Sequence, residues 1–287
     1  MFGSPYNNSM PTVDFTLNSG DCVTLNYVQL NPSAAKTLFF LHGLGTTHEC
    51  WVQQLDYFGA RDYRVIAMDL PGFGSSIIHR GTFGLELTTD CILQLLYYLG
   101  IQRTSLIGHS MGGPITLDCC SRHPNYFEKC VLISTFYRLR PTSFSTALAL
   151  IKRFIWANFQ DADHQAQFIA QRTFPDAMES GMREAFVKQI LSTNKDVYRN
   201  AVNLMARINL KDEARNLKRP PLVITGLQDR TIAPRLQHEL FLQIPNALEL
   251  TLKDGRHGMI VNQAGIINRA IEAFIQPDQE LALNITP

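Results

Sequence analysis

Gly108-His109-Ser110-Met111-Gly112 is the stretch of sequence that decides the fold, and it directly follows the apolar run 104–107. A Gly-x-Ser-x-Gly pattern between a strand and a helix is typical of a nucleophile elbow, a sharp turn that holds a serine in a strained backbone conformation. The small residues two before and two after the serine avoid clashes in that turn. Because segment 114–120 is apolar and compatible with a helix, we interpret Ser110 as a nucleophile.

A serine hydroxyl becomes a good nucleophile only when a histidine can take its proton and a carboxylate orients that histidine. In proteins with a nucleophile elbow both partners follow the serine in the chain, at the carboxyl ends of later strands. Asp229 follows the apolar run 222–225 after a tight turn, and His257 lies in the loop between the last predicted strand and the last predicted helix. The sequence therefore predicts the catalytic residues Ser110, Asp229 and His257.

Two other residues after the serine compete for these roles. His238 lies within a helix-like segment, where we expect it on the surface. Asp254 is so close to His257 in the sequence that its carboxylate has little room to reach the far nitrogen of the ring. Both are therefore weaker candidates than Asp229 and His257.

An oxyanion hole needs two backbone N–H groups that point at the carbonyl oxygen of the substrate. The residue after the nucleophile, Met111, supplies one of them in elbow proteins. The second comes from the loop after an earlier strand, and the glycine-rich turn His42-Gly43-Leu44-Gly45 follows the apolar run 38–41. We therefore predict the backbone N–H groups of Leu44 and Met111 as the oxyanion hole.

The bulk composition describes an ordinary globular protein. Of its 287 residues, 45% are hydrophobic and 18% are charged, and the net charge is +1. This balance gives no indication of nucleic-acid binding. The sequence has no signal-peptide pattern and no apolar stretch long enough for a membrane span, and its six cysteines form no Cys-x-x-Cys pair. We expect a cytoplasmic protein with reduced thiols and no membrane span.

The apolar pattern divides the chain into two kinds of segment. Short apolar runs alternate with helix-like segments over much of the chain, which is typical of a mostly parallel sheet flanked by helices. Residues 13–17 and 22–29 predict a hairpin before that sheet. Between residues 136 and 219 the strand pattern is absent, and helix-like periodicity appears near 144–158, 162–172, 178–192 and 196–208. We therefore predict an α/β core formed by residues 1–135 and 220–287, with an inserted helical cap at 136–219.

Charge is distributed unevenly between these two parts. The predicted cap has 14 Lys and Arg residues against 8 Asp and Glu residues, whereas acidic residues are in excess in the predicted core. A solvated set of helices accounts for such a distribution, and a surface for an acidic partner or an anionic substrate also accounts for it.

Together these motifs resemble the α/β-hydrolase superfamily over roughly residues 24–135 and 218–276. The matching stretches are His42-Gly43-Leu44-Gly45 with Trp51, Asp69-Leu70-Pro71-Gly72-Phe73-Gly74-Ser75-Ser76, the elbow, Gly226-x-x-Asp229 and His257. The resemblance implies an α/β-hydrolase fold and a serine nucleophile. Members of the family with an aspartate at the elbow are disfavoured because position 110 is Ser. Arg256 departs from the pattern, since the residue before the histidine is often small in the family.

Motifs for cofactors and metals are absent from the sequence. The segment Gly72-Phe73-Gly74-Ser75-Ser76-Ile77 lacks the third glycine of a dinucleotide fingerprint, and neither a P-loop nor a His-Glu-x-x-His motif occurs. We expect no cofactor and no metal.

The predicted reaction is acyl transfer to water, and the cap decides the substrate. An apolar roof over the site favours an aliphatic acyl chain over a small charged substrate. Our first hypothesis is a carboxylesterase on a small or medium-chain acyl ester, similar to the monoacylglycerol lipases. The second is a similarity to the methyl-ester esterases that release pimeloyl-acyl carrier protein for biotin synthesis, with Arg138, Arg140, Lys152 and Arg153 receiving an acidic carrier protein. Carbon–carbon bond hydrolases, and relatives that bind a ligand without turnover, share the fold and rank below these two.

Overall fold

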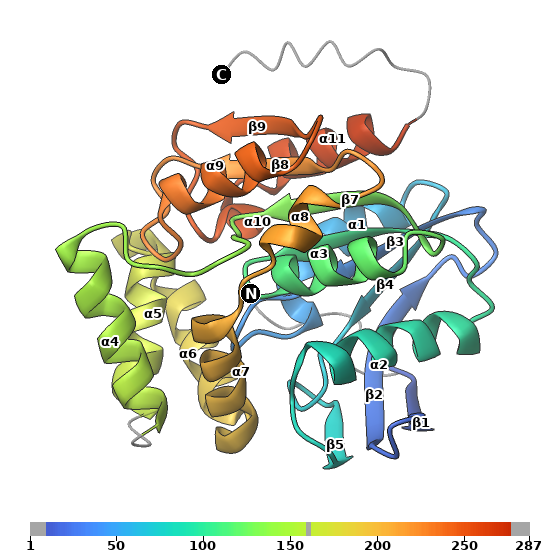
Figure 1. Cartoon of the computed structure of the whole chain (residues 1–287), viewed down its shortest axis with the longest axis horizontal. Coiled ribbons are helices and arrows are strands. Elements are labelled where there is room, and N and C mark those ends of the chain that lie inside the picture. Colours follow the sequence, from blue (N-terminus) through green and yellow to red (C-terminus); the bar gives the residue numbers. More distant parts are fainter. Residues whose placement is uncertain (1–9, 159–161, 277–287) are drawn as a thin grey trace.

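The computed structural model describes residues 10–158 and 162–276. A mostly parallel sheet flanked by helices crosses the centre of this part of the chain, as the sequence predicts (Figure 1). The strand order is β1-β2-β4-β3-β6-β7-β8-β9, and β5 also pairs with β2. The strands are β1 Thr12–Thr16, β2 Cys22–Leu30, β3 Lys36–Leu41, β4 Tyr63–Met68, β5 Ile77–Arg80, β6 Thr104–His109, β7 Phe127–Ile133, β8 Leu222–Gly226 and β9 Leu248–Leu252.

The central strands are buried along nearly their whole length because helices cover both of their faces. Every residue of β6 and of β8 is buried, and in β3 only Lys36 is exposed. A strand buried on both faces reads as a continuous apolar run rather than an alternating one. Strands β4, β3, β6, β7, β8 and β9 pair in parallel, so the loops after β3, β6, β8 and β9 meet at one edge of the sheet.

Two layers of helices cover the two faces of the sheet. Apolar side chains of α1, α10 and α11 form one buried cluster with the sheet, and those of α2, α3 and α9 belong to a second cluster on the other face. The bounds of these helices are α1 Val52–Gly59, α2 Leu85–Tyr98, α3 Gly112–Arg122, α9 Pro234–Gln243, α10 Met259–Asn262 and α11 Ala264–Ile275.

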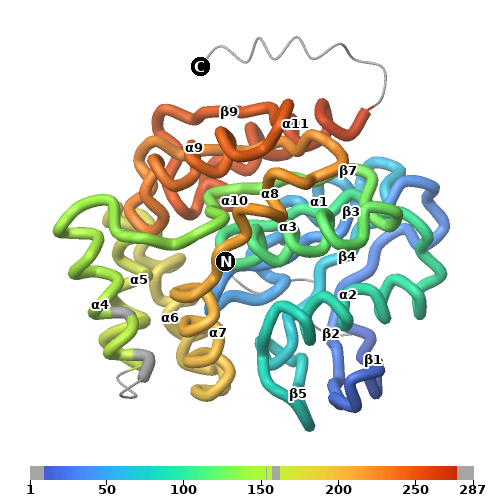
Figure 2. Tube along the Cα trace, viewed as in Figure 1, coloured from blue at the N-terminus to red at the C-terminus, as the bar shows by residue number. Residues whose placement is uncertain are grey.

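Four helices between β7 and β8 lie together beside the sheet, and we call them the cap helices (Figure 1). They are α4 Phe144–Asn158, α5 Ala162–Thr173, α6 Ser180–Ser192 and α7 Lys195–Arg207, with the short 3₁₀ turn η2 Ala177–Glu179 before α6. The chain enters and leaves this group side by side. Arg138 forms an antiparallel bridge with Asn209, and the N–H of Leu210 donates to the carbonyl of Tyr137 at 2.9 Å. Figure 2 traces this path out to α4 and back from α7.

Several short elements differ from the sequence-based expectation or are absent from it. The pattern did not indicate β5 or α1, since the first is a short, mostly exposed strand. Helix α8 Lys211–Arg215 falls within the segment predicted as cap, yet it packs against α3 and α9. The sequence pattern could not place it because a five-residue helix has too few turns to show an apolar face.

Candidate active site

Ser110 lies in the turn between β6 and α3, where its backbone takes a φ of 54°. An L-residue pays a steric cost in this left-handed region, so the surroundings must hold it there. The Ser110 N–H donates to the Ile133 carbonyl at 3.0 Å, and the Thr135 hydroxyl donates to the Ser110 carbonyl at 2.7 Å. A Cβ at Gly112 would collide with the Leu41 carbonyl, which is why the turn needs a glycine there.

The three residues predicted as catalytic lie within hydrogen-bonding distance of one another. His257 Nε2 is 3.0 Å from the Ser110 Oγ, and His257 Nδ1 is 2.8 Å from the Asp229 Oδ2. All three side chains are buried. They reach each other because β6, β8 and β9 end at the same edge of the sheet. The competing residues lie elsewhere: Asp254 is exposed, and His238 is an exposed residue of α9 that contacts Glu249.

The Asp229 carboxylate is oriented by further donors. Its Oδ1 accepts from the backbone N–H groups of Thr231 at 2.7 Å and Ile232 at 2.9 Å. Its Oδ2 accepts from the Gln237 Nε2 at 2.9 Å in addition to His257. Gln237 is fully buried, and sequence analysis missed it because a glutamine within a helix carries no motif.

The loop after β3 passes directly over the serine. A Cβ at Gly43 would lie 3.2 Å from the Ser110 Cβ, so glycine allows this approach. The Gly43 carbonyl accepts from His42 Nδ1 at 2.8 Å and from the Thr46 hydroxyl at 3.0 Å. The Gly43 C=O and the Leu44 N–H belong to the same peptide group, and the N–H and C=O of a trans peptide point in opposite directions. The Leu44 N–H therefore points to the side opposite these two donors. Within the described residues, neither this N–H nor that of Met111 donates to a protein acceptor.

A family model described as "alpha/beta hydrolase fold" matches residues 36–263. The chain belongs to the α/β-hydrolase family.

Curated relatives of this α/β-hydrolase carry several different hydrolase names. The chain is 26% identical to 3-oxoadipate enol-lactonase 2 of Acinetobacter baylyi, over 93% of the chain and 99% of the relative. It is 24% identical to (E)-2-((N-methylformamido)methylene)succinate hydrolase of the same organism, over 83% of the chain and 90% of the relative. It is 23% identical to bifunctional esterase/perhydrolase DCH of Acinetobacter calcoaceticus, over 89% and 97%.

Solved structures share the fold. The enol-lactonase from Burkholderia xenovorans LB400 superposes with a TM-score of 0.81 at 23% identity, covering 91% of this chain and 99% of that one. An esterase from Exiguobacterium antarcticum superposes with a TM-score of 0.81 at 15% identity, covering 92% and 99%. The chain is thus a hydrolase by family.

Two buried histidines support the loops of the hydrolase site in their neutral form. Burial lowers the pKa of His42 to about 4, and its Nε2 accepts from the Leu70 N–H at 2.9 Å. Burial, together with the neighbouring His257 ring, lowers the pKa of His109 to about 3. The Nε2–H of His109 donates to the His257 carbonyl at 2.8 Å. Both rings therefore act as neutral hydrogen-bonding groups that fix the loops around Ser110.

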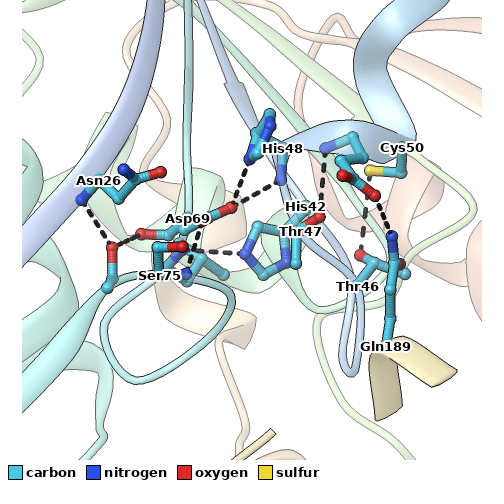
Figure 3. Close-up of polar contacts among 12 residues, drawn as sticks. Asn26, His42, Thr46, Thr47, His48, Cys50, Asp69, Ser75 and Gln189 are labelled. Carbon is cyan, nitrogen blue, oxygen red and sulfur yellow. Dashed lines mark hydrogen bonds and ion pairs between the residues drawn. The ribbon is translucent and has the colours of Figure 1, made fainter. Parts of the chain in front are cut away.

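Asp69 ties the loop over the serine to the turn after β4 (Figure 3). Its Oδ1 accepts from the backbone N–H of His48 at 2.9 Å and from the His48 ring at 2.8 Å, and its Oδ2 accepts from the Ser75 N–H at 2.9 Å. Burial alone would raise the pKa of Asp69, but the hydrogen bonds and charge of His48 outweigh it and lower that pKa. Three hydrogen bonds stabilise the charged Asp69 carboxylate, and through them it connects the two loops.

A cavity with a volume of about 600 Å³ opens beside Ser110 and His257. Apolar side chains from the core and the cap helices form much of its wall: Leu44, Ile169, Phe174, Phe186, Ile260 and Val261. Gln189 of α6 also lines it and donates to the Glu49 Oε2 at 2.8 Å, which joins the cap to the loop over the serine (Figure 3). The cavity suits a largely apolar group next to the serine hydroxyl.

Arg256, the departure from the family pattern, connects the histidine loop to the cap. Its guanidinium pairs with Asp176 and lies 3.6 Å from the Glu179 Oε2, both at the turn η2. The hydrogen bond to Asp176 raises the pKa of Arg256. The residue before His257 thus contacts the cap and leaves the ring of His257 free to face Ser110 and Asp229.

Within residues 10–158 and 162–276, no three His, Cys, Asp or Glu side chains are grouped so that they could hold a metal ion. No helix of the same residues combines the length and apolarity that crossing a bilayer requires.

Proposed function

We propose that this α/β-hydrolase is a serine esterase that cleaves carboxylic esters through an acyl-enzyme on Ser110. The observation that carries the proposal is the unbroken hydrogen-bonded series from the Ser110 Oγ through His257 to Asp229, at the wall of an apolar cavity. A histidine 3.0 Å from the hydroxyl is within reach of its proton.

The reaction proceeds in two acyl-transfer steps. The Ser110 Oγ attacks the ester carbonyl while His257 Nε2 accepts its proton, and His257 then protonates the leaving alcohol. Asp229 holds the His257 ring in the required tautomer and stabilises its cation. The backbone N–H groups of Leu44 and Met111 stabilise the negative oxygen of each tetrahedral intermediate. Water activated by His257 then attacks the acyl-enzyme, releases the acid and restores Ser110.

The substrate is a small or medium-chain acyl ester. The apolar lining of the cavity beside Ser110 supports an aliphatic acyl group. The names of two relatives, an enol-lactonase and an esterase/perhydrolase, also fit chemistry at an ester-type carbonyl. Monoacylglycerol and other esters of this class are alternatives, and a carbon–carbon bond hydrolase or a ligand-binding role ranks lower.

A carrier-bound methyl ester stays the second hypothesis. Of the basic residues assigned to a carrier protein, Lys152 and Arg138 are exposed, whereas Arg140 is already paired with Glu239 at 2.7 Å. The side chain of Arg153 lies outside the described part of the chain. Engagement of Arg140 within the protein favours the free ester over the carrier-bound one.

We also propose a cytoplasmic location. All six cysteines are free thiols, and five of them are buried. Unpaired thiols fit a reducing compartment.

The proposal is tested with p-nitrophenyl esters from acetate to palmitate. We expect a chain-length optimum that Ser110→Ala abolishes, while Ser105→Ala on the preceding strand β6 retains activity. A fluorophosphonate probe should label the wild type and the Ser105→Ala variant but not Ser110→Ala. Labelling without hydrolysis of any ester would contradict the ester substrate, and absence of labelling would contradict the nucleophile.

A further inference from the structure

Helix α4 carries a row of exposed apolar side chains. The exposed fractions are 87% for Phe144, 45% for Leu148, 55% for Ile151 and 44% for Ile155. Positions separated by four, three and four residues fall on one face of an α-helix. We call these four side chains the outer face of α4. Large apolar side chains grouped at a surface mark a site of interaction.

Packing within the described chain uses the opposite face of this helix. Helix α4 packs against α5 and α7. Thr146, Ala149 and Leu150 line a second cavity of about 430 Å³ beneath it. The cap helices stand beside the sheet in Figure 1, with α4 at the outer edge of the molecule. The outer face therefore serves something other than the packing of the described chain.

The second cavity adjoins the cavity that contains Ser110. Both are lined by Ile169 of α5 and by Thr231 of the loop after β8. Helix α4 thus has an apolar row facing outward and, on its other side, a cavity that borders the proposed acyl site. A surface that attaches to the outer face lies across α4 from this second cavity.

The small number of residues in the outer face argues against a second copy of the chain as its partner. A stable protein interface buries about 800 Å² on each partner and involves roughly 20–30 residues. Helix α4 has 15 residues, of which four form the outer face. By contrast, an amphipathic helix that lies in a lipid surface needs only one apolar face, with cationic residues beside it.

The excess of basic residues around α4 favours an anionic surface as its partner. Lys152 is exposed next to Ile151 in the sequence of α4. The sequence of α4 contains two basic residues and no acidic one, and segment 136–207, which contains the cap helices, has 10 basic residues against 6 acidic ones. We propose that the outer face of α4 docks on an anionic lipid surface, a role that does not depend on the ester hydrolysis proposed above.

The test is flotation of the full-length protein with vesicles of phosphatidylcholine, with and without phosphatidylglycerol. The wild type should partition to the vesicles that contain phosphatidylglycerol. The double variant Phe144→Glu with Ile151→Glu should partition less by a factor on the order of a hundred, because two apolar side chains no longer enter the lipid. Lys152→Glu should weaken the preference for phosphatidylglycerol.

The matched control is Tyr97→Glu with Leu242→Glu, since both residues are exposed and lie outside the cap helices. This control should float like the wild type, and all variants should hydrolyse a dissolved short-chain ester alike. Failure of the wild type to float would overturn the proposal whether or not it is an esterase. So would a concentration-dependent dimer in sedimentation velocity that the α4 double variant abolishes, because the occupant would then be a second copy.

Discussion

Gln237 shows how a single side chain outside the reacting atoms can set their geometry. Its Nε2 donates to the Asp229 Oδ2 at 2.9 Å and to the Ile232 carbonyl at 2.8 Å. Its Oε1 accepts from the Gly226 N–H at 3.2 Å. The amide therefore joins the end of β8, the loop after it and the carboxylate into one unit.

Gln237→Leu is expected to lower kcat of the proposed esterase by about tenfold to a hundredfold, because a small misorientation of Asp229 passes directly to His257. KM should change little, since Gln237 does not line the cavity. Unpaired backbone groups at Gly226 and Ile232 should also lower the free energy of unfolding by about 1–3 kcal/mol each. Steady-state kinetics and urea unfolding give these values.

The control is Gln243→Leu at the end of the same helix, which should keep the wild-type kcat. If Gln237→Leu changed KM and left kcat unaltered, its role in positioning Asp229 would be refuted.

At this scale the sequence pointed to three side chains that lie within hydrogen-bonding distance of one another, and it missed the glutamines near them. Chain order and the turn glycines pointed to Asp229 and His257, and the structure brings both to Ser110. Gln237 and Gln189 escaped notice because their partners are distant in the sequence and glutamine has no distinctive spacing in a helix.

The loop after β9, at the edge of the sheet, contacts the turn η2, which lies among the cap helices. Arg256 reaches Asp176 and Glu179, and the Asn262 Nδ2 donates to the Glu179 Oε1 at 3.0 Å. The cap is therefore attached to the same loop that carries His257.

Arg256→Gln is expected to raise KM up to about fivefold with kcat nearly unchanged, because a partly exposed ion pair contributes only modestly to holding the cap. Asp176→Asn should have a similar effect. The variant with both changes should be no worse than either single variant, because both remove the same interaction. Kinetics at low and high salt measure this, and high salt should reduce the difference from the wild type.

Arg235→Gln, which loses a surface pair with Glu239, serves as the control for a changed arginine. Additive effects of Arg256→Gln and Asp176→Asn would show that the two residues act separately.

Elements were predicted well where the pattern is long and poorly where it is short. The cap helices expected near 144–158 and 196–208 are α4 Phe144–Asn158 and α7 Lys195–Arg207. Their length gives several turns over which apolar spacing repeats. Strand β5, with four mostly exposed residues, and α8, with five residues, offer no such repetition.

Two buried histidines should make the folded protein less stable in acid. His42 and His109 have pKa values of about 4 and about 3 because burial disfavours their charged forms. In the unfolded chain a histidine titrates near pH 6.5. Below about pH 6.5 the unfolded state therefore binds more protons than the folded state, and the free energy of unfolding falls as the pH falls.

His109→Gln is expected to reduce this pH dependence by about 1.4 kcal/mol per pH unit between about pH 6 and pH 4, because one proton no longer distinguishes the two states. Urea unfolding at several pH values measures the slope. His79→Gln on the exposed strand β5 is the control and should keep the wild-type slope. Equal slopes for wild type and His109→Gln would contradict the neutral, buried state of His109.

The paired entry and exit of the cap, at Arg138 with Asn209 and Tyr137 with Leu210, have an evolutionary consequence. Because the two ends of the segment between β7 and β8 are hydrogen-bonded to each other, this segment can be lengthened, shortened or replaced while β7 and β8 keep their positions. The serine, histidine and aspartate all come from outside that segment. Evolution can therefore replace the cap helices without moving these three side chains. An engineer could likewise graft the cap helices of a relative at the same two points.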